Sequence, residues 1–204
     1  MKIQLNPITP LRGYILEESL EKGTPRYIIE IEFEKWCQLH AGFFIQRYKE
    51  EKGEHWTENE KRNMYVGLAA QRAFEMMLSK MVILRDSNDP MLDMRQEKDY
   101  DVLTPIGKIE VKGVDHYCEV VLVKLSEWHH NEFLVVWKMN PANTELEMLG
   151  WQSRIQVEAY PRTPKGATKY NPFSVSYVIP LEDLNQPQAF IQKLKQNSLA
   201  NKDA

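Results

Sequence analysis

The sequence predicts a mixed α/β (α+β) fold in which a central mixed β-sheet is flanked by helices. Two segments with apolar residues at helical spacing come first, a series of short strand-like segments follows, and a further helical segment closes the chain. This order of elements is typical of a sheet that packs helices against its faces. A length of 204 residues suits one domain with embellishments.

Composition indicates an ordinary globular protein, with 43% apolar residues and a net charge of −3. Cys37 and Cys118 lie far apart and form no metal-binding spacing, so two free thiols in a reducing compartment are the simpler interpretation, with a disulfide the alternative. Neither a signal peptide nor a membrane-spanning run is apparent, so we expect a cytoplasmic, intracellular protein without a membrane partner. The net charge repels nucleic acid, and a binder of DNA would need a local basic surface.

Residues 1–25 are rich in proline and glycine, and we expect an irregular N-terminal arm with a helical turn in LEESLEKG. A helix is predicted over residues 28–52 from apolar side chains at three- and four-residue spacing. The segment IIEIEF also alternates, so a strand is the alternative for its first turns. A second helix is predicted from Thr57, which forms a capping box with Glu60, to Met81.

Short segments rich in β-branched and aromatic residues then predict strands, with a tight turn over residues 104–107 between the first two. The run LVVWK is apolar enough for a central strand buried on both faces. The segment AYPRTPKGATKYNPF is predicted to be a loop, and residues 181–196 a closing helix with Pro187 near its start. We expect a single domain over residues 26–196 and a frayed tail over 197–204. The predicted strands are DYDVLT, KIEVKG, CEVVLVKL, EFLVVWKM, ELEMLGW and FSVSYVI.

The first predicted hairpin brings charged side chains together. A turn centred on residues 105 and 106 places Asp101 opposite Glu110, provided that no bulge shifts the register. Directly opposed Cβ atoms lie about 4.5–5.5 Å apart. Lys112 shares the face of Glu110, because alternate strand residues point the same way, while Ile109 and Val111 point to the core. The alternative, without a catalytic role, is a solvent-exposed strand face that carries a Glu–Lys ion pair.

Two opposed carboxylates repel each other by about 1 kcal/mol in water and about 4 kcal/mol at an effective dielectric constant of 20. Protonation of one acid or a bound cation relieves this repulsion. Oxygen ligands favour a hard ion such as Mg²⁺, which takes one or two carboxylates and keeps several waters. Such an ion polarises a phosphodiester and lowers the pKa of bound water. A neighbouring Lys112 would orient that water.

The run Asp101-x8-Glu110-Val111-Lys112, on a hairpin that follows the helix GLAAQRAFEMML, resembles the PD-(D/E)XK nuclease superfamily over about residues 60–155. The resemblance implies a restriction-endonuclease-like fold and a Mg²⁺-dependent endonuclease, with Mn²⁺ as a substitute, that hydrolyses DNA phosphodiester bonds. Asp101 and Glu110 would bind the metal together with the backbone carbonyl of Val111. Lys112 would position or activate water. Many relatives dimerise, so the resemblance is compatible with a homodimer.

The resemblance also implies a contribution from the preceding helix. Gln71 stands where many relatives carry Glu, and Glu75 lies four residues on and so on a similar helical face. Gln71 would complete the catalytic site and Glu75 would be a metal ligand, with an exposed polar helix face as the alternative. Asp99 and Tyr100 precede Asp101, so the proline of the family's name is absent. Gln71 in place of Glu leaves the number of metal ions open.

Candidate nucleic-acid contacts follow the strands. Arg162, Lys165 and Lys169, with nearby tyrosines, predict a phosphate-gripping loop, with a polar surface loop as the equal alternative. His116 follows the E-V-K-G run and would contact DNA, although a solvated histidine is the simpler interpretation. Two further functions stay open: a structure-selective nuclease for junctions, flaps or single strands, and a catalytically inactive DNA-binding member of the fold.

Overall fold

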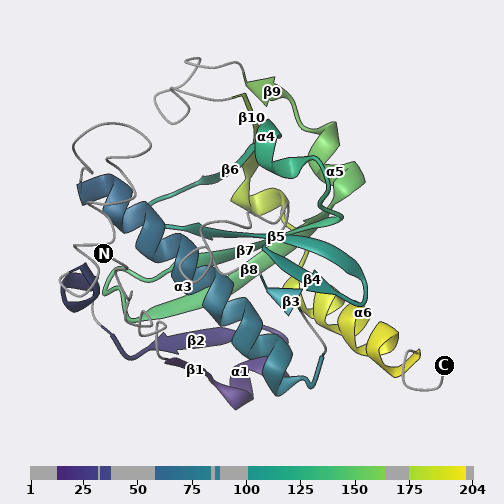
Figure 1. The fold of residues 1–204 in the computed structure, drawn as a ribbon, viewed down its shortest axis with the longest axis horizontal. Coiled ribbons are helices and arrows are strands. Elements are labelled where there is room, and N and C mark those ends of the chain that lie inside the picture. The colour runs from purple at the N-terminus through teal and green to yellow at the C-terminus, as the bar shows by residue number, and fades with distance from the viewer. Residues whose placement is uncertain are drawn as a thin grey trace, which may run out of the picture.

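The computed structural model describes residues 13–31, 33–37, 58–83, 86–87, 101–163 and 175–200. A seven-stranded sheet has the order β1-β2-β8-β7-β5-β4-β3 (Figure 1). Neighbouring strands pair antiparallel, except that β5 and β7 are parallel. The predicted mixed α/β class with a mixed sheet is therefore confirmed. The strands are β1 (Gly13–Ile15), β2 (Arg26–Ile29), β3 (Asp86–Ser87), β4 (Val102–Thr104), β5 (Gly107–Val114), β7 (Phe133–Met139) and β8 (Glu145–Ser153).

Helices cover one face of this sheet and a second, smaller sheet covers the other. α3 (Glu58–Lys80) and α6 (Pro187–Ala200) share one buried core with the strands of the main sheet. Figure 1 shows α3 running diagonally across these strands. The smaller sheet has the order β6-β10-β9. No helix in the part of the chain that the structure describes could cross a membrane. The elements of the second side are β6 (Val120–Lys124), α4 (Leu125–Trp128), α5 (Arg154–Ala159), β9 (Arg162–Thr163), β10 (Ser176–Pro180) and the 3₁₀ turn η1 (Leu181–Asp183).

Strand alternation divides the apolar residues of the central strands between two cores. In β7, Val135 and Trp137 join the core under α3 and α6, whereas Leu134 and Val136 join the core under the smaller sheet. All four side chains are fully buried. The prediction that LVVWK is a central strand is therefore confirmed. A strand that is buried on both faces of a sheet needs a continuous run of apolar residues.

α3 approaches β5 so closely that one position of the strand must be glycine. A Cβ atom at Gly113 would lie 2.3 Å from the backbone oxygen of Val66. On the helix side, Ala69, Ala70 and Ala73 are fully buried and add little bulk. Small residues on both elements therefore set α3 directly over the strand that carries Glu110 and Lys112.

The prediction of a helix beginning at residue 28 is wrong, and the alternative of a strand holds there. Residues 26–29 form β2, which pairs antiparallel with β8, and residues 33–37 are helical. Tyr27 and Ile29 are buried on one face, which is the two-residue period of a strand. Within the expected irregular arm, residues 13–15 form β1 and pair with β2, while the helical turn in LEESLEKG is confirmed as α1 (Glu17–Glu21). Residues 1–12 and 38–57 lie outside the described part.

The second predicted helix is confirmed as α3, although Thr57 of its capping box lies outside the described residues. The short helices α4 and α5 were not predicted, and β9 lies in the expected loop. Residues 181–183 form η1, and the closing helix begins only at Pro187, because proline suits the first helical position, where its missing N–H is not needed. α6 extends to Ala200, so the expected frayed tail is helical over its first four residues.

Candidate active site

The predicted hairpin has the predicted register. Val102 pairs with Ile109, Leu103 with Lys108 and Thr104 with Gly107. Gly107 has a φ of 124°, in the region that favours glycine, and this lets the chain turn tightly into β5.

Asp101 lies just before β4, next to the middle of β5. Its backbone N–H donates to the oxygen of Ile109 at 3.2 Å. Its Oδ2 accepts a hydrogen bond from the N–H of Val111 at 2.7 Å. The carboxylate thus takes the place of a backbone acceptor in the ladder. This hydrogen bond places the Asp101 carboxylate beside Val111, the residue between Glu110 and Lys112 in sequence.

Glu110 and Lys112 form an ion pair on the face of β5 that looks toward the smaller sheet. The Lys112 Nζ lies 2.6 Å from Glu110 Oε1, and the Glu110 side chain is only 7% exposed. Their neighbours on β7 are Leu134 and Val136, which belong to the core on that side. Val111 points to the opposite core, as the alternation predicts.

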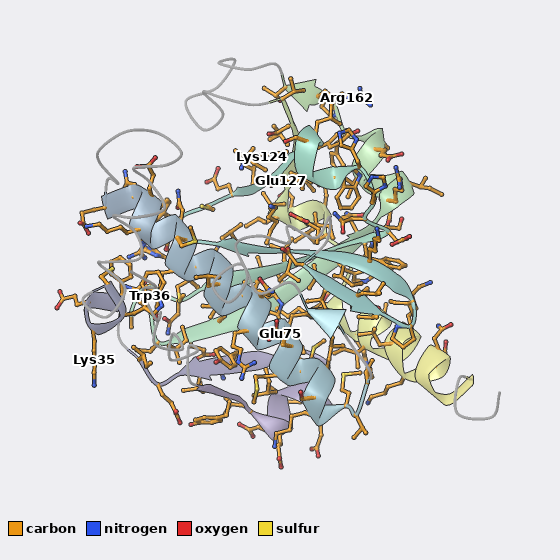
Figure 2. The ribbon with its side chains drawn as sticks, viewed as in Figure 1. Lys35, Trp36, Glu75, Lys124, Glu127 and Arg162 are labelled. Carbon is orange, nitrogen blue, oxygen red and sulfur yellow. The ribbon has the colours of Figure 1, made fainter. Side chains whose placement is uncertain are left out.

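A second carboxylate, Glu127, binds the same lysine. Glu127 lies on α4, and its Oε2 is 3.0 Å from Lys112 Nζ, while its Oε1 is 2.5 Å from Lys124 Nζ. Figure 2 shows Lys124 and Glu127 side by side at α4. Glu127 is not among the residues that the sequence predicts for the site. Its spacing from Lys124 indicates a local pair at the start of a helical turn, but nothing in the sequence links it to Lys112.

Asn131 links Glu110 and Glu127 by hydrogen bonds, and it is likewise not predicted from the sequence. Its side chain is fully buried, and its Nδ2 donates to Glu110 Oε2 at 3.2 Å and to the backbone oxygen of Glu127 at 3.0 Å. Its Oδ1 is buried and has no hydrogen-bond partner among the described residues. A buried acceptor without a donor costs about 1–3 kcal/mol, which favours a water or a cation at this oxygen. In sequence, an asparagine before a strand indicates only a turn.

The charges shift one another's proton affinities. Burial and the Glu110 carboxylate raise the pKa of Asp101 to about 7. Burial by itself would lower the pKa of Lys112, but Glu110 and Glu127 outweigh it and raise that pKa. Burial likewise opposes ionisation of Glu127, yet Lys112 and Lys124 lower its pKa to about 2. Near pH 7 Lys112 is therefore an ammonium ion, suited to stabilise negative charge rather than to accept a proton.

These residues fit a hard divalent cation. No group of three or more histidine, cysteine, aspartate or glutamate side chains that could hold a metal occurs among the described residues. Mg²⁺ needs only one or two carboxylates when waters or substrate oxygens complete its shell. Asp101 and Glu110 supply two carboxylates, and the unpartnered Oδ1 of Asn131 supplies a further oxygen close to Glu110. The Asp101 carboxyl, with its raised pKa, also gains from a nearby positive charge.

Gln71 and Glu75 lie on α3, which covers the opposite face of the sheet from Glu110 and Lys112. Gln71 Nε2 donates to Glu75 Oε1 at 3.3 Å, and Arg72 Nη1 donates to Glu75 Oε2 at 3.0 Å. Figure 2 shows Glu75 on α3, well separated from Glu127. The structure therefore does not bring Glu75 together with Lys112 and Glu127, and the roles of Gln71 and Glu75 stay predictions.

Two of the four predicted nucleic-acid contacts, His116 and Arg162, lie in the described part of the chain, on different elements. His116 follows the end of β5, where its Nδ1 lies 2.8 Å from Asp115 Oδ1. It follows Lys112 by four residues, beyond the end of β5, and its described ion-pair partner is Asp115 rather than a hairpin acid. Arg162 is exposed on β9, and its guanidinium lies 5.6 Å from the centre of the Tyr177 ring. Lys165 and Lys169 lie outside the described residues.

Comparison with protein-family models, with curated proteins and with solved structures finds no match to this chain. The chemistry of the site is therefore inferred from its own residues.

Proposed function

We propose that this protein is a Mg²⁺-dependent nuclease of the PD-(D/E)XK type, with a restriction-endonuclease-like fold, that hydrolyses phosphodiester bonds in DNA. The observation that carries the proposal is the meeting of three charged side chains on one hairpin. Glu110 and Lys112 are 2.6 Å apart, and the Asp101 carboxylate accepts the N–H of the residue between them. Two acids beside an ammonium ion suit a reaction in which negative charge builds up on a phosphate.

Asp101 and Glu110 would hold the metal, Mg²⁺ or Mn²⁺, with the backbone carbonyl of Val111 as a further ligand by the family resemblance. When bound, the metal supplies Lewis-acid chemistry and a more acidic water. Asn131 orients Glu110 through the hydrogen bond to Oε2. In this arrangement one oxygen of Glu110 contacts Asn131 and the other contacts Lys112.

Lys112 would orient the attacking water and stabilise the charge that develops on the phosphate. Its raised pKa keeps it protonated at neutral pH. Glu127 is its second anchor, at 3.0 Å. Glu127 would therefore keep the Lys112 ammonium group at the site even when Glu110 binds the metal.

A catalytically inactive DNA-binding protein is the second candidate, and one observation favours it. The chain of contacts Glu110–Lys112–Glu127–Lys124 balances two acids with two lysines. Such a network is electrostatically neutral by itself and does not require a metal. An inactive member of the fold would retain it as a structural feature.

A divalent-ion-dependent nicking assay on supercoiled plasmid and on single-stranded and branched DNA tests the proposal. The wild type should cleave plasmid with Mg²⁺ or Mn²⁺ and not with EDTA. Asp101→Ala and Lys112→Ala should each lower the rate by roughly 10²–10⁴-fold. Lys80→Ala is the matched control, because Lys80 forms an exposed ion pair with Glu17 at the end of α3.

Direct Mn²⁺ binding, followed by electron paramagnetic resonance, separates the candidates further. Loss of Mn²⁺ binding in Asp101→Ala, together with loss of cleavage, supports the nuclease. Preferential cleavage of branched or single-stranded DNA assigns the structure-selective variant of the same chemistry. DNA binding without any cleavage under all metal conditions would overturn the proposal in favour of the inactive DNA-binding protein.

A further inference from the structure

A cavity of about 380 Å³, open to solvent, lies where β8, α5 and η1 meet. It is lined by Gln152, Gln156, Ala159, Tyr160 and Asp183. Gln152 is the buried next-to-last residue of β8, Gln156 and Ala159 are on α5, and Asp183 is on η1. None of these residues belongs to the charged hairpin described above.

The cavity is on the same side of the main sheet as the candidate active site. Glu110 pairs with Leu134 across β5 and β7, and Leu134 pairs with Gln152 across β7 and β8. Residues paired in this way point to one face. With strands about 4.8 Å apart, the Cα atoms of Glu110 and Gln152 are about 10 Å apart. At roughly 3.4 Å of rise per nucleotide or more, a strand of a few nucleotides spans this distance.

Hydrogen bonds inside the cavity engage some of the polar groups on its wall. Gln152 Nε2 donates to the backbone oxygen of Asp183 at 2.6 Å. Gln156 Oε1 accepts from the Ser153 N–H at 2.9 Å and from Asn185 Nδ2 at 3.0 Å. These contacts fix both glutamine side chains and the backbone of η1.

Two groups keep capacity for a ligand. The Asp183 carboxylate accepts the Tyr160 hydroxyl at 3.1 Å through Oδ2, and a carboxylate has about four acceptor sites. The Gln156 Nε2 has two N–H groups, and its described contact, with Asn185 Oδ1, is long at 3.5 Å. The cavity thus offers a strong acceptor and an amide donor beside the ring of Tyr160.

We propose that this cavity binds a guanine base of a nucleic-acid strand. Guanine presents two adjacent donors, N1–H and the 2-amino group, next to the acceptor O6. Asp183 would accept both donors, Gln156 would donate to O6, and Tyr160 would pack against the ring. Adenine would turn the lone pair of N1 toward the carboxylate, and each pyrimidine offers only one donor group on this edge.

A strand fits the cavity better than a free nucleotide does, because of two neighbours. The candidate active site lies on the same face of the sheet, with Glu110 two strands away from Gln152. Arg162 lies two residues after Tyr160 in extended chain, is exposed, and forms no ion pair with a carboxylate among the described residues. Its guanidinium is suited to a backbone phosphate. The strand as occupant rests on the proposed function, whereas selectivity for guanine does not.

Fluorescence anisotropy with single-stranded oligonucleotides tests the proposal. The probes are oligothymidylates that carry one guanine, hypoxanthine, 7-deazaguanine or adenine, bound in EDTA by the Lys112→Ala protein so that no cleavage occurs. Hypoxanthine lacks the 2-amino group, so its oligonucleotide should bind about tenfold more weakly than the guanine one, as expected for one hydrogen bond to a charged group. The 7-deazaguanine probe should bind like guanine, because N7 is not on the edge that is read.

Two variants test whether Asp183 is the source of the preference for guanine. Asp183→Asn should abolish the preference for guanine over hypoxanthine, whereas Glu182→Gln, an exposed neighbour on the same turn, should keep it. Equal binding of the guanine, hypoxanthine and adenine probes, or an unchanged preference in a folded Asp183→Asn protein, would overturn the proposal. Deoxyguanosine monophosphate bound as tightly as the guanine oligonucleotide would overturn the strand as occupant.

Failure here is distinguishable from failure of the nuclease proposal. Cleavage of plasmid without any guanine preference rejects the cavity assignment alone. A guanine preference without cleavage under any metal condition rejects the nuclease alone.

Discussion

Among single residues, the candidate site depends most on Lys112, which has two carboxylate partners. A single buried ion pair often gains little, because desolvation offsets the attraction. Here Glu110 lies at 2.6 Å and Glu127 at 3.0 Å, and together they raise the pKa of the lysine despite its burial. The positive charge is therefore retained in a place where an isolated lysine would tend to lose it.

Glu127→Gln should remove one of these partners and weaken catalysis without removing a proposed metal ligand. The rate should fall by roughly 10–100-fold, the value of one hydrogen bond to a charged group. Glu110 still contacts Lys112 in this variant, so the lysine stays protonated at neutral pH and the loss is one of positioning, with Mn²⁺ binding retained. Rates of DNA cleavage at neutral pH and Mn²⁺ binding followed by electron paramagnetic resonance check both effects.

Glu158→Gln is the control for this variant, because Glu158 forms an exposed ion pair with Arg154 on α5. Its rate and its Mn²⁺ binding should match the wild type. A Glu127→Gln protein that cleaves DNA at the wild-type rate would show that Glu127 does not position Lys112.

At the element scale, an ion pair ties α3 to the end of β5. Arg62 on α3 forms two contacts with the Asp115 carboxylate, one of them 2.8 Å from Nη2 to Oδ1, and also donates to Asn143 Oδ1 in the β7–β8 turn at 2.8 Å. The Asp115 side chain is only 4% exposed. Together with the close contact at Gly113, this pair holds the helix over the site-bearing strand.

Asp115→Asn should cost about 3 kcal/mol of unfolding free energy at pH 7, because it leaves Arg62 without its ionic partner. Burial alone would raise the pKa of Asp115, but Arg62 and His116 outweigh it and lower that pKa. A depressed carboxyl pKa gives stability that is present above the ordinary value near 4 and is lost as pH falls below it. The difference between variant and wild type should therefore shrink between pH 5 and pH 3.

Urea denaturation at pH 7, 5 and 3 measures this difference. Glu58→Gln removes an exposed ion pair with Lys61 and should cost less than about 1 kcal/mol at any pH. A destabilisation by Asp115→Asn that stayed constant down to pH 3 would contradict an ionic origin.

At the scale of the whole molecule, the site lies on the face of the main sheet that the smaller sheet covers. Glu127 and Asn131 come from the segment that connects the parallel strands β5 and β7, and the proposed guanine cavity lies beyond β8 on the same face. The net charge of −3 is unfavourable for a DNA-binding protein. Any attraction to DNA must come from a local group of cations rather than from the average field.

DNA binding should consequently depend steeply on salt. For three or four phosphate contacts, the affinity of the Lys112→Ala protein should fall roughly 10–100-fold between 50 and 200 mM NaCl. Anisotropy titrations in EDTA at several salt concentrations give the slope, and Arg162→Ala should reduce it by about one. An affinity that does not change with salt would contradict binding through backbone phosphates.

The features that could be predicted from the amino-acid sequence are local ones. The turn over residues 104–107 and the two-residue alternation of β5 suffice to predict the register of the hairpin and the sides on which Glu110 and Val111 lie. α3 and the buried strand β7 were equally predictable, because long periodic or continuous apolar runs allow few interpretations. For this reason the three charged residues of the hairpin were found without coordinates.

The remaining features depend on contacts between distant segments, which appear only in the folded protein. Residues 26–29 form a strand because they pair with β8. The sequence left this open, because a short apolar run fits both the helical and the strand period. Glu127 and Asn131 reach Lys112 and Glu110 through the connection between parallel strands, and Asp183 meets Gln152 across 31 residues of sequence. Contacts between distant segments leave no pattern in a single chain, because they depend on how the layers stack.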